Sequence, residues 1–381
     1  MSVNHRGEGP TDKTIRELCI RAGWRCEFEG CGKNLSVEKL TNREIKLSIV
    51  AHIVASSPNG PRGNSESHAL SDKIDNLMLL CQDHHTLIDR FPDIYTVSVL
   101  KTMKETHEEK VKRLLDSLKY PETNIVFLQA PIKGYVLNID RSLAIEAIRL
   151  QKRNNGEKPN LIIDIGNGLE YNDEKYWKNL ERQLITKYER ILEAFYVDNP
   201  QAHLSLFPFA PIPIIAKLGW LLSDKKSVDI YQKTRQPDTW SWMTTECTND
   251  FEILIDRITP DERVDRVAIV ISLSGDIALG RITEVFDANI IYQIKAERMG
   301  VDCIKSQEDL KNFWQKYHIV CDEIANKYKG AEVALFPAVP VSAAFELGRR
   351  LMPNVHPKIM IYDQRDKFEK AFTIGGERNV E

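Results

Sequence analysis

The sequence predicts an α/β protein in which a small N-terminal domain precedes two tandem Rossmann-like units. Three observations support this prediction: a change of composition near residue 120, an alternation of strand-like and helix-like segments after it, and an internal repeat within that later part. The 381 residues are 42% hydrophobic and 28% charged, which suits two or three globular domains with cores of their own. We expect one domain over residues 1–120 and a second over residues 121–381.

The N-terminal domain is predicted from short helical patterns separated by loops. An amphipathic pattern over residues 12–22 predicts a short helix, and a second amphipathic helix is expected from about Thr96. The composition changes at KYPET, within residues 118–125, where we place the domain boundary. The net charge is only -3, so any contact with nucleic acid must be local; the basic stretch 101–117 is one candidate, and a solvated helix face is the alternative.

Cysteine usage and the lack of long apolar runs favour a cytoplasmic protein. The seven cysteines are an odd number, and Cys26, Cys31 and Cys81 fall in the first quarter of the chain. This distribution suits a reducing compartment and a local metal site better than a disulfide framework. No apolar run approaches the roughly 18 residues of a membrane span, and the first residues lack the apolar core of a signal peptide. We therefore expect no membrane partner.

Beyond residue 120, strand-like and helix-like segments alternate in two similar series. The apolar segments NLIIDIGNG and VAIVISLSGD come before long helical patterns at residues 176–195 and 309–328, and a short strand ending in Ile-Tyr follows in each series. The order strand, helix, strand, helix, strand occurs twice, which predicts parallel sheets covered by helices on both faces. We expect the two units at about residues 155–235 and 262–365.

An internal repeat lies inside the two series. Residues 206–219 read LFPFAPIPIIAKLG, and residues 335–348 read LFPAVPVSAAFELG. Six residues of the first copy have an identical counterpart 129 positions later: Leu206, Phe207, Pro208, Pro211, Leu218 and Gly219. Because the flanking elements repeat as well, the repeated unit is a supersecondary structure and not a stray motif.

The repeat and its surroundings supply candidate ligand-binding residues. In open α/β sheets, ligands bind beyond the carboxyl ends of the strands, where helix N-termini present backbone N–H groups. Prolines there let a loop approach a ligand, a Ser-Gly pair suits phosphate, and aromatic faces suit base stacking. The candidates are Phe207, Pro208, Pro211, Phe336, Pro337 and Pro340 from the repeat, Ser274 and Gly275 from ISLSGD, and Arg235, Trp240 and Trp242 from RQPDTWSWM. The alternative is that the prolines only begin helices and the apolar residues only pack.

Two closely spaced pairs of metal-ligating residues lie in the N-terminal domain. Cys26 and Cys31 stand in CEFEGC, and Cys81 and His84 stand in CQDH about fifty residues later. Four Cys or His ligands on two tight turns are typical of a structural zinc site, which would stabilise a domain with little core of its own. His84 is the expected fourth ligand, and the adjacent His85 is the alternative.

A further pattern surrounds these pairs. His52 ends the apolar segment KLSIVAH, Asn76 precedes LMLL, and His85 follows the second ligand pair. Together with the zinc ligands, this set resembles the HNH nuclease family of the ββα-metal type over about residues 10–110. The resemblance implies that His52 is the general base and that His85 binds Mg²⁺ or another divalent cation at the scissile phosphate. By the same resemblance, Asn76 orients His52 or completes the metal shell.

One position departs from the family pattern. Many members carry Asp or His directly before the base, whereas this chain has Ala51. A further metal ligand would then come from Asp75 or from water.

The C-terminal part resembles a second family. The paired LFP-x-x-P motifs, the Trp-Ser-Trp segment and the position behind an HNH domain are similar to the SAVED domain of bacterial CBASS anti-phage effectors, over about residues 125–381. That domain resembles two fused CARF-like units. The resemblance implies that a cyclic di- or trinucleotide binds the sensor and that the chain forms a homo-oligomer, a dimer that becomes a tetramer on activation. The nuclease would then degrade double-stranded DNA.

Two other functions would account for part of the sequence. A restriction-type HNH endonuclease would have the same N-terminal domain, but its second half should be a basic DNA-reading domain, whereas this half is mixed in charge. Alternatively, the HNH part is inactive and the chain is a ligand-binding interaction protein, which the intact His52, Asn76 and His85 argue against.

Overall fold

The structure is a computed structural model that describes residues 9–36, 48–135, 139–156, 158–259 and 263–376. The chain divides into two compact units, with the break between Lys119 and Tyr120. Among the described residues, no helix combines the length and the apolar character that crossing a membrane requires.

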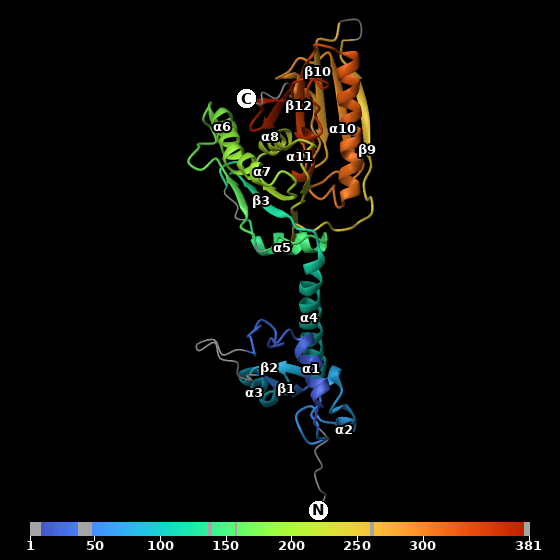
Figure 1. Cartoon of the computed structure of the whole chain (residues 1–381). Helices are drawn as coiled ribbons and strands as arrows, with labels where there is room; N and C mark the ends of the chain where they lie inside the picture. Colours follow the sequence, from blue (N-terminus) through green and yellow to red (C-terminus); the bar gives the residue numbers. More distant parts are fainter. Residues whose placement is uncertain (1–8, 37–47, 136–138, 157, 260–262, 377–381) are drawn as a thin grey trace, which may run out of the picture. The chain divides into compact units, whose positions relative to one another are not determined.

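The first unit is built around a two-stranded antiparallel sheet that is followed by a helix (Figure 1). Its described elements are α1 (Asp12–Arg21), β1 (Ile49–His52), α2 (Ser67–Leu70), the 3₁₀ turn η1 (Ile74–Asn76), β2 (Leu77–Leu80), α3 (Gln82–Arg90), α4 (Val97–Asp116) and the 3₁₀ turn η2 (Ser117–Lys119). β1 pairs with β2 so that His52 lies opposite Leu77. α3 starts directly after β2 and packs against β1.

Local signals in the sequence explain these elements. All four residues of β2 are apolar and buried, so the strand forms the centre of the unit. The Thr96 side chain caps α4 by accepting a hydrogen bond from the Val99 N–H, at the place where the amphipathic pattern predicts a helix to begin. The buried core consists of short apolar stretches from α1, the two strands, α3 and the start of α4.

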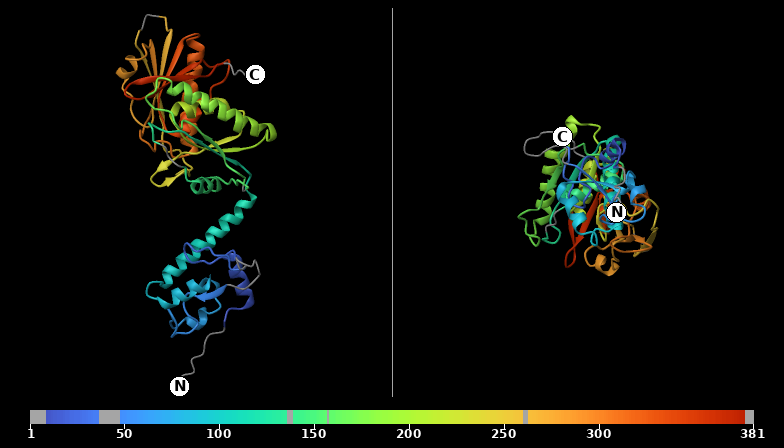
Figure 2. Two further views of the ribbon diagram at one scale, coloured as in Figure 1. Left: turned by 90° about the vertical axis from the view of Figure 1, so that its left-hand side faces the viewer. Right: turned by 90° about the horizontal axis from the view of Figure 1, so that it is seen from below.

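The second unit contains two open sheets, seen from further sides in Figure 2. The parallel four-stranded sheet has the order β4-β3-β5-β6, and the six-stranded sheet has the order β14-β13-β12-β10-β11-β9 with an antiparallel strand at each edge. The first half comprises β3 (Asn124–Gln129), α5 (Arg141–Leu150), β4 (Leu161–Asp164), α6 (Tyr176–Tyr188), the π-helical turn η3 (Glu189–Glu193), α7 (Ala194–Asp198), β5 (Leu204–Phe209), α8 (Ile212–Leu222), β6 (Val228–Ile230), β7 (Thr234–Arg235) and β8 (Asp238–Thr239). The second half comprises β9 (Phe251–Arg257), β10 (Arg266–Ser272), α9 (Leu279–Thr283), β11 (Ile290–Ala296), α10 (Gln307–Lys327), β12 (Glu332–Ala338), α11 (Val341–Arg349), β13 (Ile359–Gln364) and β14 (Phe368–Ile374).

The two sheets repeat one strand order, which confirms the predicted tandem α/β units. β3, β4, β5 and β6 hold the same places as β10, β11, β12 and β13. One detail of the predicted alignment is wrong, because NLIIDIGNG contains β4, a second strand, whereas VAIVISLSGD contains β10, a first strand. The first copy therefore begins at β3, upstream of residue 155. The sequence pattern matched two apolar strands of similar composition that occupy different positions in their sheets.

The two copies meet through α8 and α11, which cross each other closely (Figure 1). A Cβ atom added to Gly219 would lie far inside van der Waals contact with the carbonyl oxygen of Phe345. One added to Gly348 would collide in the same way with the carbonyl oxygen of Ala216, the residue that matches Phe345 in the other copy. Glycine has no Cβ and so lets two helix backbones approach this closely, which explains why Leu-Gly recurs in the repeat.

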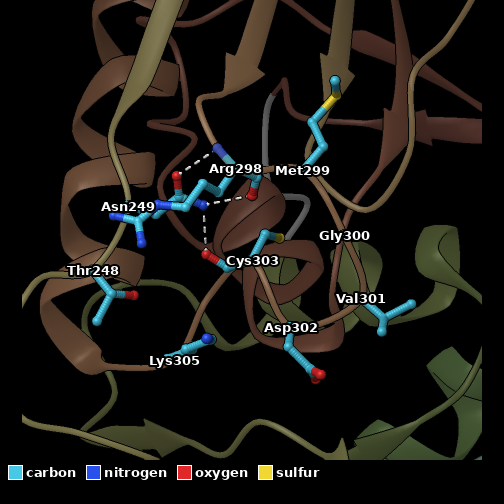
Figure 3. Close-up of a pocket in the computed structure, with 9 residues that line it drawn as sticks. All are labelled: Thr248, Asn249, Arg298, Met299, Gly300, Val301, Asp302, Cys303 and Lys305. Carbon is cyan, nitrogen blue, oxygen red and sulfur yellow. Dashed lines mark hydrogen bonds between the residues drawn. The ribbon is translucent and has the colours of Figure 1, made fainter.

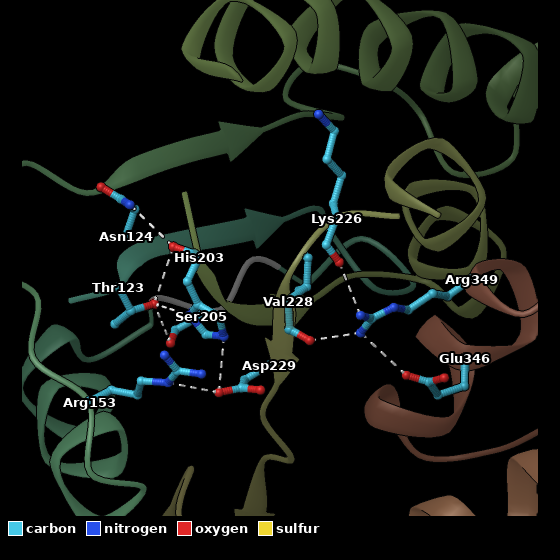
Figure 4. Close-up of polar contacts among 10 residues, drawn as sticks. All are labelled: Thr123, Asn124, Arg153, His203, Ser205, Lys226, Val228, Asp229, Glu346 and Arg349. Carbon is cyan, nitrogen blue, oxygen red and sulfur yellow. Dashed lines mark hydrogen bonds and ion pairs between the residues drawn. The ribbon is translucent and has the colours of Figure 1, made fainter. Parts of the chain in front are cut away.

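Cationic side chains from the crossing helices bind the backbone of the opposite copy. Arg349 on α11 donates to the carbonyl oxygens of Val228, at 2.8 Å, and Lys226, at 3.2 Å (Figure 4). Lys217 on α8 donates to the carbonyl oxygen of Thr373 in β14, at 3.3 Å. Each half thus supplies hydrogen bonds to a terminal strand region of the other half, which ties the two copies into one unit.

We predict that Gly219→Ala and Gly348→Ala each destabilise the second unit by about 1–3 kcal/mol, because the added methyl group overpacks the crossing. Denaturant unfolding of the full chain would measure the loss. Gly280→Ala is the matched control, since Gly280 lies in α9 and an added Cβ meets no atom within 4 Å. If Gly219→Ala and Gly348→Ala unfold at the same denaturant concentration as Gly280→Ala, the close approach of the α8 and α11 backbones would be contradicted.

Candidate functional site

Four predicted metal ligands lie together in the first unit. The ligand atoms of Cys26, Cys31, Cys81 and His84 are all within 4.8 Å of one another. The Nδ1 atom of His84 is 3.2 Å from the Cys81 sulfur and 3.6 Å from the Cys26 sulfur, and its ring stacks on Phe28. A tetrahedral metal ion with bonds of about 2.0–2.3 Å places its ligand atoms about 3.5 Å apart, so the group has the size that such an ion needs.

A turn and a helix start position these ligands. The N–H of Cys31 bonds to the carbonyl oxygen of Phe28 and closes the turn of the first pair. Cys81 is the N-cap residue of α3, so His84 lies three residues later on the first helical turn, on the side of Cys81. His85 is rotated by about 100° around the helix axis. The helix therefore places His84 in the cluster and His85 on a different side.

Cys26 and Cys81 of the cluster are buried, which makes their free thiolates costly. Burial raises the pKa of the Cys26 thiol to about 12, and the neighbouring Cys81 adds to the rise although backbone hydrogen bonds oppose it. A bound divalent cation reverses this effect, because it stabilises the deprotonated form of each cysteine ligand. Three cysteines and one histidine at these distances fit a metal ion.

His52 stands at the end of β1 with its ring held by the backbone. Its Nε2 atom is 3.0 Å from the carbonyl oxygen of Ser71. A carbonyl oxygen only accepts hydrogen bonds, so in the neutral ring we assign the proton to Nε2 and the lone pair to Nδ1. An imidazole in this tautomer can take a proton from water at Nδ1. The hydrogen bond therefore favours the tautomer that a general base at Nδ1 needs.

Asn76 is buried, and its side-chain amide binds two backbone segments that adjoin His52 and its partner Ser71. Its Oδ1 accepts a hydrogen bond from the Val54 N–H at 2.8 Å, and its Nδ2 donates to the carbonyl oxygens of Val54 at 2.9 Å and Leu70 at 3.2 Å. Val54 follows His52, and Leu70 precedes Ser71, whose carbonyl holds the ring. The amide thus fixes both segments that orient His52, and ligation of a metal by Asn76 stays a prediction.

His85 lies on α3 beside a carboxylate. Its Nε2 is 3.6 Å from the Oδ2 of Asp89, and both side chains are about one third exposed. Asp89 also forms an ion pair with Arg62, whose side chain is only 4% exposed. Asp75, the carboxylate considered from the sequence, is 87% exposed and lies 3.9 Å from an arginine of α1. Among the described residues, Asp89 is thus the carboxylate that pairs with His85.

Sequence reasoning missed both Asp89 and Arg62. For Asp89 a signal existed, since residues four apart on a helix are neighbours and Asp89 follows His85 at that spacing. For Arg62 no such signal exists, because the segment SSPNGPRGN reads as an ordinary polar loop.

Three of the four aromatic residues predicted to bind ligand in the second unit are core residues. Phe207 stacks on Tyr231 with ring centroids 4.4 Å apart, and Trp240 meets its edge at 5.4 Å. The second copy repeats the stack, with Phe336 on Tyr362 at 4.6 Å. Phe207, Trp240 and Phe336 are each less than 2% exposed, so a ligand cannot touch them while the core is packed. Burial thus corrects the expectation that these three rings contact ligand.

The other predicted contact residues differ in exposure. The prolines of the repeat are all buried: Pro208, Pro211, Pro337 and Pro340. Two of them are the N-cap residues of α8 and α11, the role that the alternative interpretation assigned to them. Trp242, Ser274 and Gly275 are partly buried, and Arg235 is exposed. These last four residues stay predicted contacts.

A hollow of about 300 Å³ lies at the carboxyl end of β11 (Figure 3). It is lined by residues 248–249, 298–303 and Lys305, none of which the sequence predicted. The Nδ2 of Asn249 donates to the carbonyl oxygens of Arg298 at 2.9 Å and Cys303 at 2.8 Å, which holds the lining loop in one conformation. Buried Asp309 accepts hydrogen bonds from the backbone on both sides of the hollow, including the N–H groups of Asn249 and Lys305.

This hollow adjoins two segments that the sequence did single out. The N–H of Gly300 donates to the carbonyl oxygen of Leu273 at 2.9 Å, next to the Ser-Gly pair of ISLSGD. The N–H of Met243 donates to the carbonyl oxygen of Lys305 at 2.9 Å, directly after the tryptophan-rich segment. Leu273 of ISLSGD and Met243 are therefore joined to the lining of the hollow, and ligand binding there stays a prediction.

A chain of polar contacts near the amino ends of the four-stranded sheet resembles a nucleophile, histidine and carboxylate arrangement (Figure 4). The Oγ1 of Thr123 is 2.8 Å from the Nδ1 of His203, and the Nε2 of His203 is 3.2 Å from the Oδ2 of Asp229. Burial opposes ionisation of Asp229, but the hydrogen bond from His203 and the charge of Arg153 outweigh it and lower its pKa. Thr123 is 0% exposed. A substrate cannot reach this hydroxyl, so the contacts are structural.

Comparisons with protein-family models find one match within each of the two units. Residues 26–92 match the model of HNH endonuclease, and residues 188–374 match the model of SAVED, the SMODS-associated and fused to various effectors sensor domain. The chain therefore carries an HNH domain followed by a SAVED domain. Among curated proteins, none matches the chain.

Solved structures with a similar arrangement are SAVED/CARF-domain containing receptors named Cap4. The receptor of Acinetobacter baumannii with the cyclic trinucleotide 3'3'3'-cAAA is 12% identical, with a TM-score of 0.43 over 76% of this chain and 62% of that one. The same receptor with 2'3'3'-cAAA is 14% identical, with a TM-score of 0.43 over 82% of this chain and 66% of that one. The Moraxella osloensis receptor is 12% identical, with a TM-score of 0.39 over 76% and 60%. The chain thus spans less than two thirds of the length of these receptors.

The two adjacent histidines should differ in their effect on bound metal. We predict that His84→Ala loses the metal of the cluster, because it removes one of four ligands, whereas His85→Ala retains it. Elemental analysis of both purified variants beside wild type would measure metal per chain. Equal metal content in the two variants would contradict the assignment of His84 as the ligand.

Proposed function

We propose that the protein is a DNA endonuclease that a cyclic oligonucleotide switches on, as an effector of a CBASS-type anti-phage system. The observation that carries the proposal is the combination of an HNH domain, with His52 and His85 on a ββα scaffold, and a SAVED domain in one chain. A nuclease of low selectivity would damage its own cell if it were always active, so a sensor in the same chain is a physically sensible companion.

The proposed cleavage chemistry uses groups that the first unit already orients. His52 accepts a proton from the attacking water at Nδ1, while its Nε2 stays bonded to the Ser71 carbonyl. His85 would hold Mg²⁺ or another divalent cation, and Asn76 fixes the segments around His52. When bound, such a cation supplies positive charge to the scissile phosphate and to the leaving oxygen.

The cluster of three cysteines and His84 is proposed to hold structural zinc. Thiolate and imidazole ligands in a closed set of four are the combination that zinc favours in structural sites. Because the surrounding core is small, the metal would contribute much of the stability of this unit.

The second unit is proposed to bind a cyclic di- or trinucleotide at the edge that carries the hollow. Arg298 and Lys305 border the hollow and offer positive charge for phosphate, and Ser274, Gly275, Arg235 and Trp242 lie on segments that the sequence assigns to the ligand. We further propose that the chain is a dimer that forms tetramers when the messenger binds. A 10⁴-fold preference of the messenger for the assembled form, about 5.5 kcal/mol, suffices to invert a 1:99 equilibrium.

His52→Ala should lower DNA cleavage by about 10²–10⁴-fold, because it removes the general base of the reaction. Plasmid cleavage by the activated full chain would measure the loss, and bound metal and thermal stability should match wild type. His68→Ala is the matched control, since His68 is an exposed histidine of the same unit. Normal cleavage by His52→Ala would disprove the assignment of the base.

The full chain alone should cut plasmid DNA poorly, and one member of a panel of cyclic di- and trinucleotides should activate it. Arg298→Ala and Lys305→Ala should each raise the activating concentration about 10–100-fold without lowering the maximal rate, because each removes a charged hydrogen-bond donor for phosphate. Lys311→Ala, at an exposed lysine of α10, is the matched control. Full activity without any nucleotide, or activation unchanged in both pocket variants, would contradict this sensor site.

A further inference from the structure

Arg62 is a buried cation that binds two separate segments of the nuclease unit. Its Nε donates to the carbonyl oxygen of Ile53 at 2.7 Å, and its Nη1 donates to the carbonyl oxygen of Ile88 at 2.6 Å. Its Nη2 is 3.0 Å from the Oδ1 of Asp89. Three nitrogens of one planar group are thus used in fixed directions, which a lysine could not reproduce.

These bonds connect the neighbourhoods of both proposed catalytic histidines. Ile53 directly follows His52 at the end of β1, while Asp89 lies on α3 one helical turn after His85. The guanidinium therefore fixes the spacing between the strand that carries the base and the helix that carries the metal-binding histidine.

The two oxygens of the Asp89 carboxylate have different partners. Oδ1 faces Arg62, and Oδ2 lies 3.6 Å from the Nε2 of His85. A cation bound at about 2.1 Å to each of two neighbouring ligand atoms holds them about 3.0–3.5 Å apart, so Oδ2 and Nε2 are close to the spacing of two ligands of one ion. Both side chains are partly exposed, which leaves room for water and for phosphate oxygens.

The backbone around Arg62 supports a functional reason for its position. Arg62 has a positive φ of 56°, which costs energy for any residue with a side chain. The next residue, Gly63, packs so tightly that an added Cβ would collide with the carbonyl oxygens of Pro58 and Ser57. A compact loop thus holds a strained residue in one place, as is common where a side chain must be positioned for chemistry.

We propose that Asp89 is a further ligand of the catalytic metal beside His85, and that Arg62 is the positioning residue that orients Asp89 and holds it in register with His52. The inference rests on the proposed nuclease function. It assigns the carboxylate that Ala51 does not supply at the usual family position. In outer-shell positions of metal sites, a group that orients a ligand typically changes metal affinity or activity 10–100-fold when it is removed.

The experiment measures Mn²⁺ binding and DNA cleavage separately in the full-length, zinc-loaded protein. Electron paramagnetic resonance follows Mn²⁺ binding without DNA or nucleotide. Asp89→Asn should weaken Mn²⁺ binding about 10–100-fold and retain zinc. Arg62→Ala should weaken Mn²⁺ binding about tenfold and also lower cleavage about 10²-fold at saturating Mn²⁺, because His52 loses its register with the metal. Arg62→Lys should fall between Arg62→Ala and wild type.

Matched controls separate this role from a general effect on folding. Arg16→Ala removes an exposed arginine of α1, and Asp93→Asn neutralises an exposed aspartate. Both should bind Mn²⁺ like wild type. Wild-type Mn²⁺ affinity in Asp89→Asn and in Arg62→Lys, with zinc retained, would overturn the proposal.

Two further outcomes remain decisive. If Arg62→Ala loses zinc or unfolds, Asp89→Asn and Arg62→Lys decide the question. If wild type cuts no DNA with any cyclic nucleotide, the proposed function fails, whereas the Mn²⁺ affinities still test Asp89 and Arg62 on their own.

Discussion

The organisation of the second unit depends on the backbone contact between α8 and α11. Gly219 and Gly348 make this contact possible, because a side chain at either position would collide with a carbonyl oxygen of the other helix. The contact relates the two copies reciprocally, and Arg349 and Lys217 extend it to the opposite sheets. The two structural copies are thereby held as one unit. The carboxyl edges of their two sheets take up fixed positions relative to the crossing of α8 and α11.

A different constraint organises the first unit, where the cluster of cysteines and His84 substitutes for a large core. The same short helix that provides His84 to the cluster carries His85 on another side, so a structural ion and a catalytic ion would be positioned by one element. Asn76 and Arg62 then bind the backbone of the two residues that follow His52. Precision at the site therefore comes from buried polar groups that bind backbone, a common way to fix catalytic residues.

The sequence allowed the α/β class, the tandem units and the cluster of three cysteines with His84 to be predicted, because these depend on periodicity, on repeated residues and on ligand spacing. It did not separate aromatic residues of the core from aromatic residues that bind a ligand. The motif LFP reads the same whether its Phe packs on Tyr231 inside the protein or stacks on a nucleotide base. Likewise the burial of Arg62 results from contact with Ile88 and Asp89, which are 26 and 27 residues away. Such long-range contacts leave no local pattern.

The nuclease unit holds its proposed catalytic groups in order by itself, and this bears on how a messenger could control it. His52 has its tautomer set by Ser71, and the segments around it are fixed by Asn76 and Arg62, all through bonds inside the first unit. Because these bonds all lie within the first unit, we infer that control acts on access of DNA or on the meeting of two chains. One general base serves one strand, so a double-strand break takes two centres or two successive cuts. An oligomer could bring the cleavage sites of two chains to one DNA duplex. Messenger binding would then lead to a double-strand break without any change inside either cleavage site.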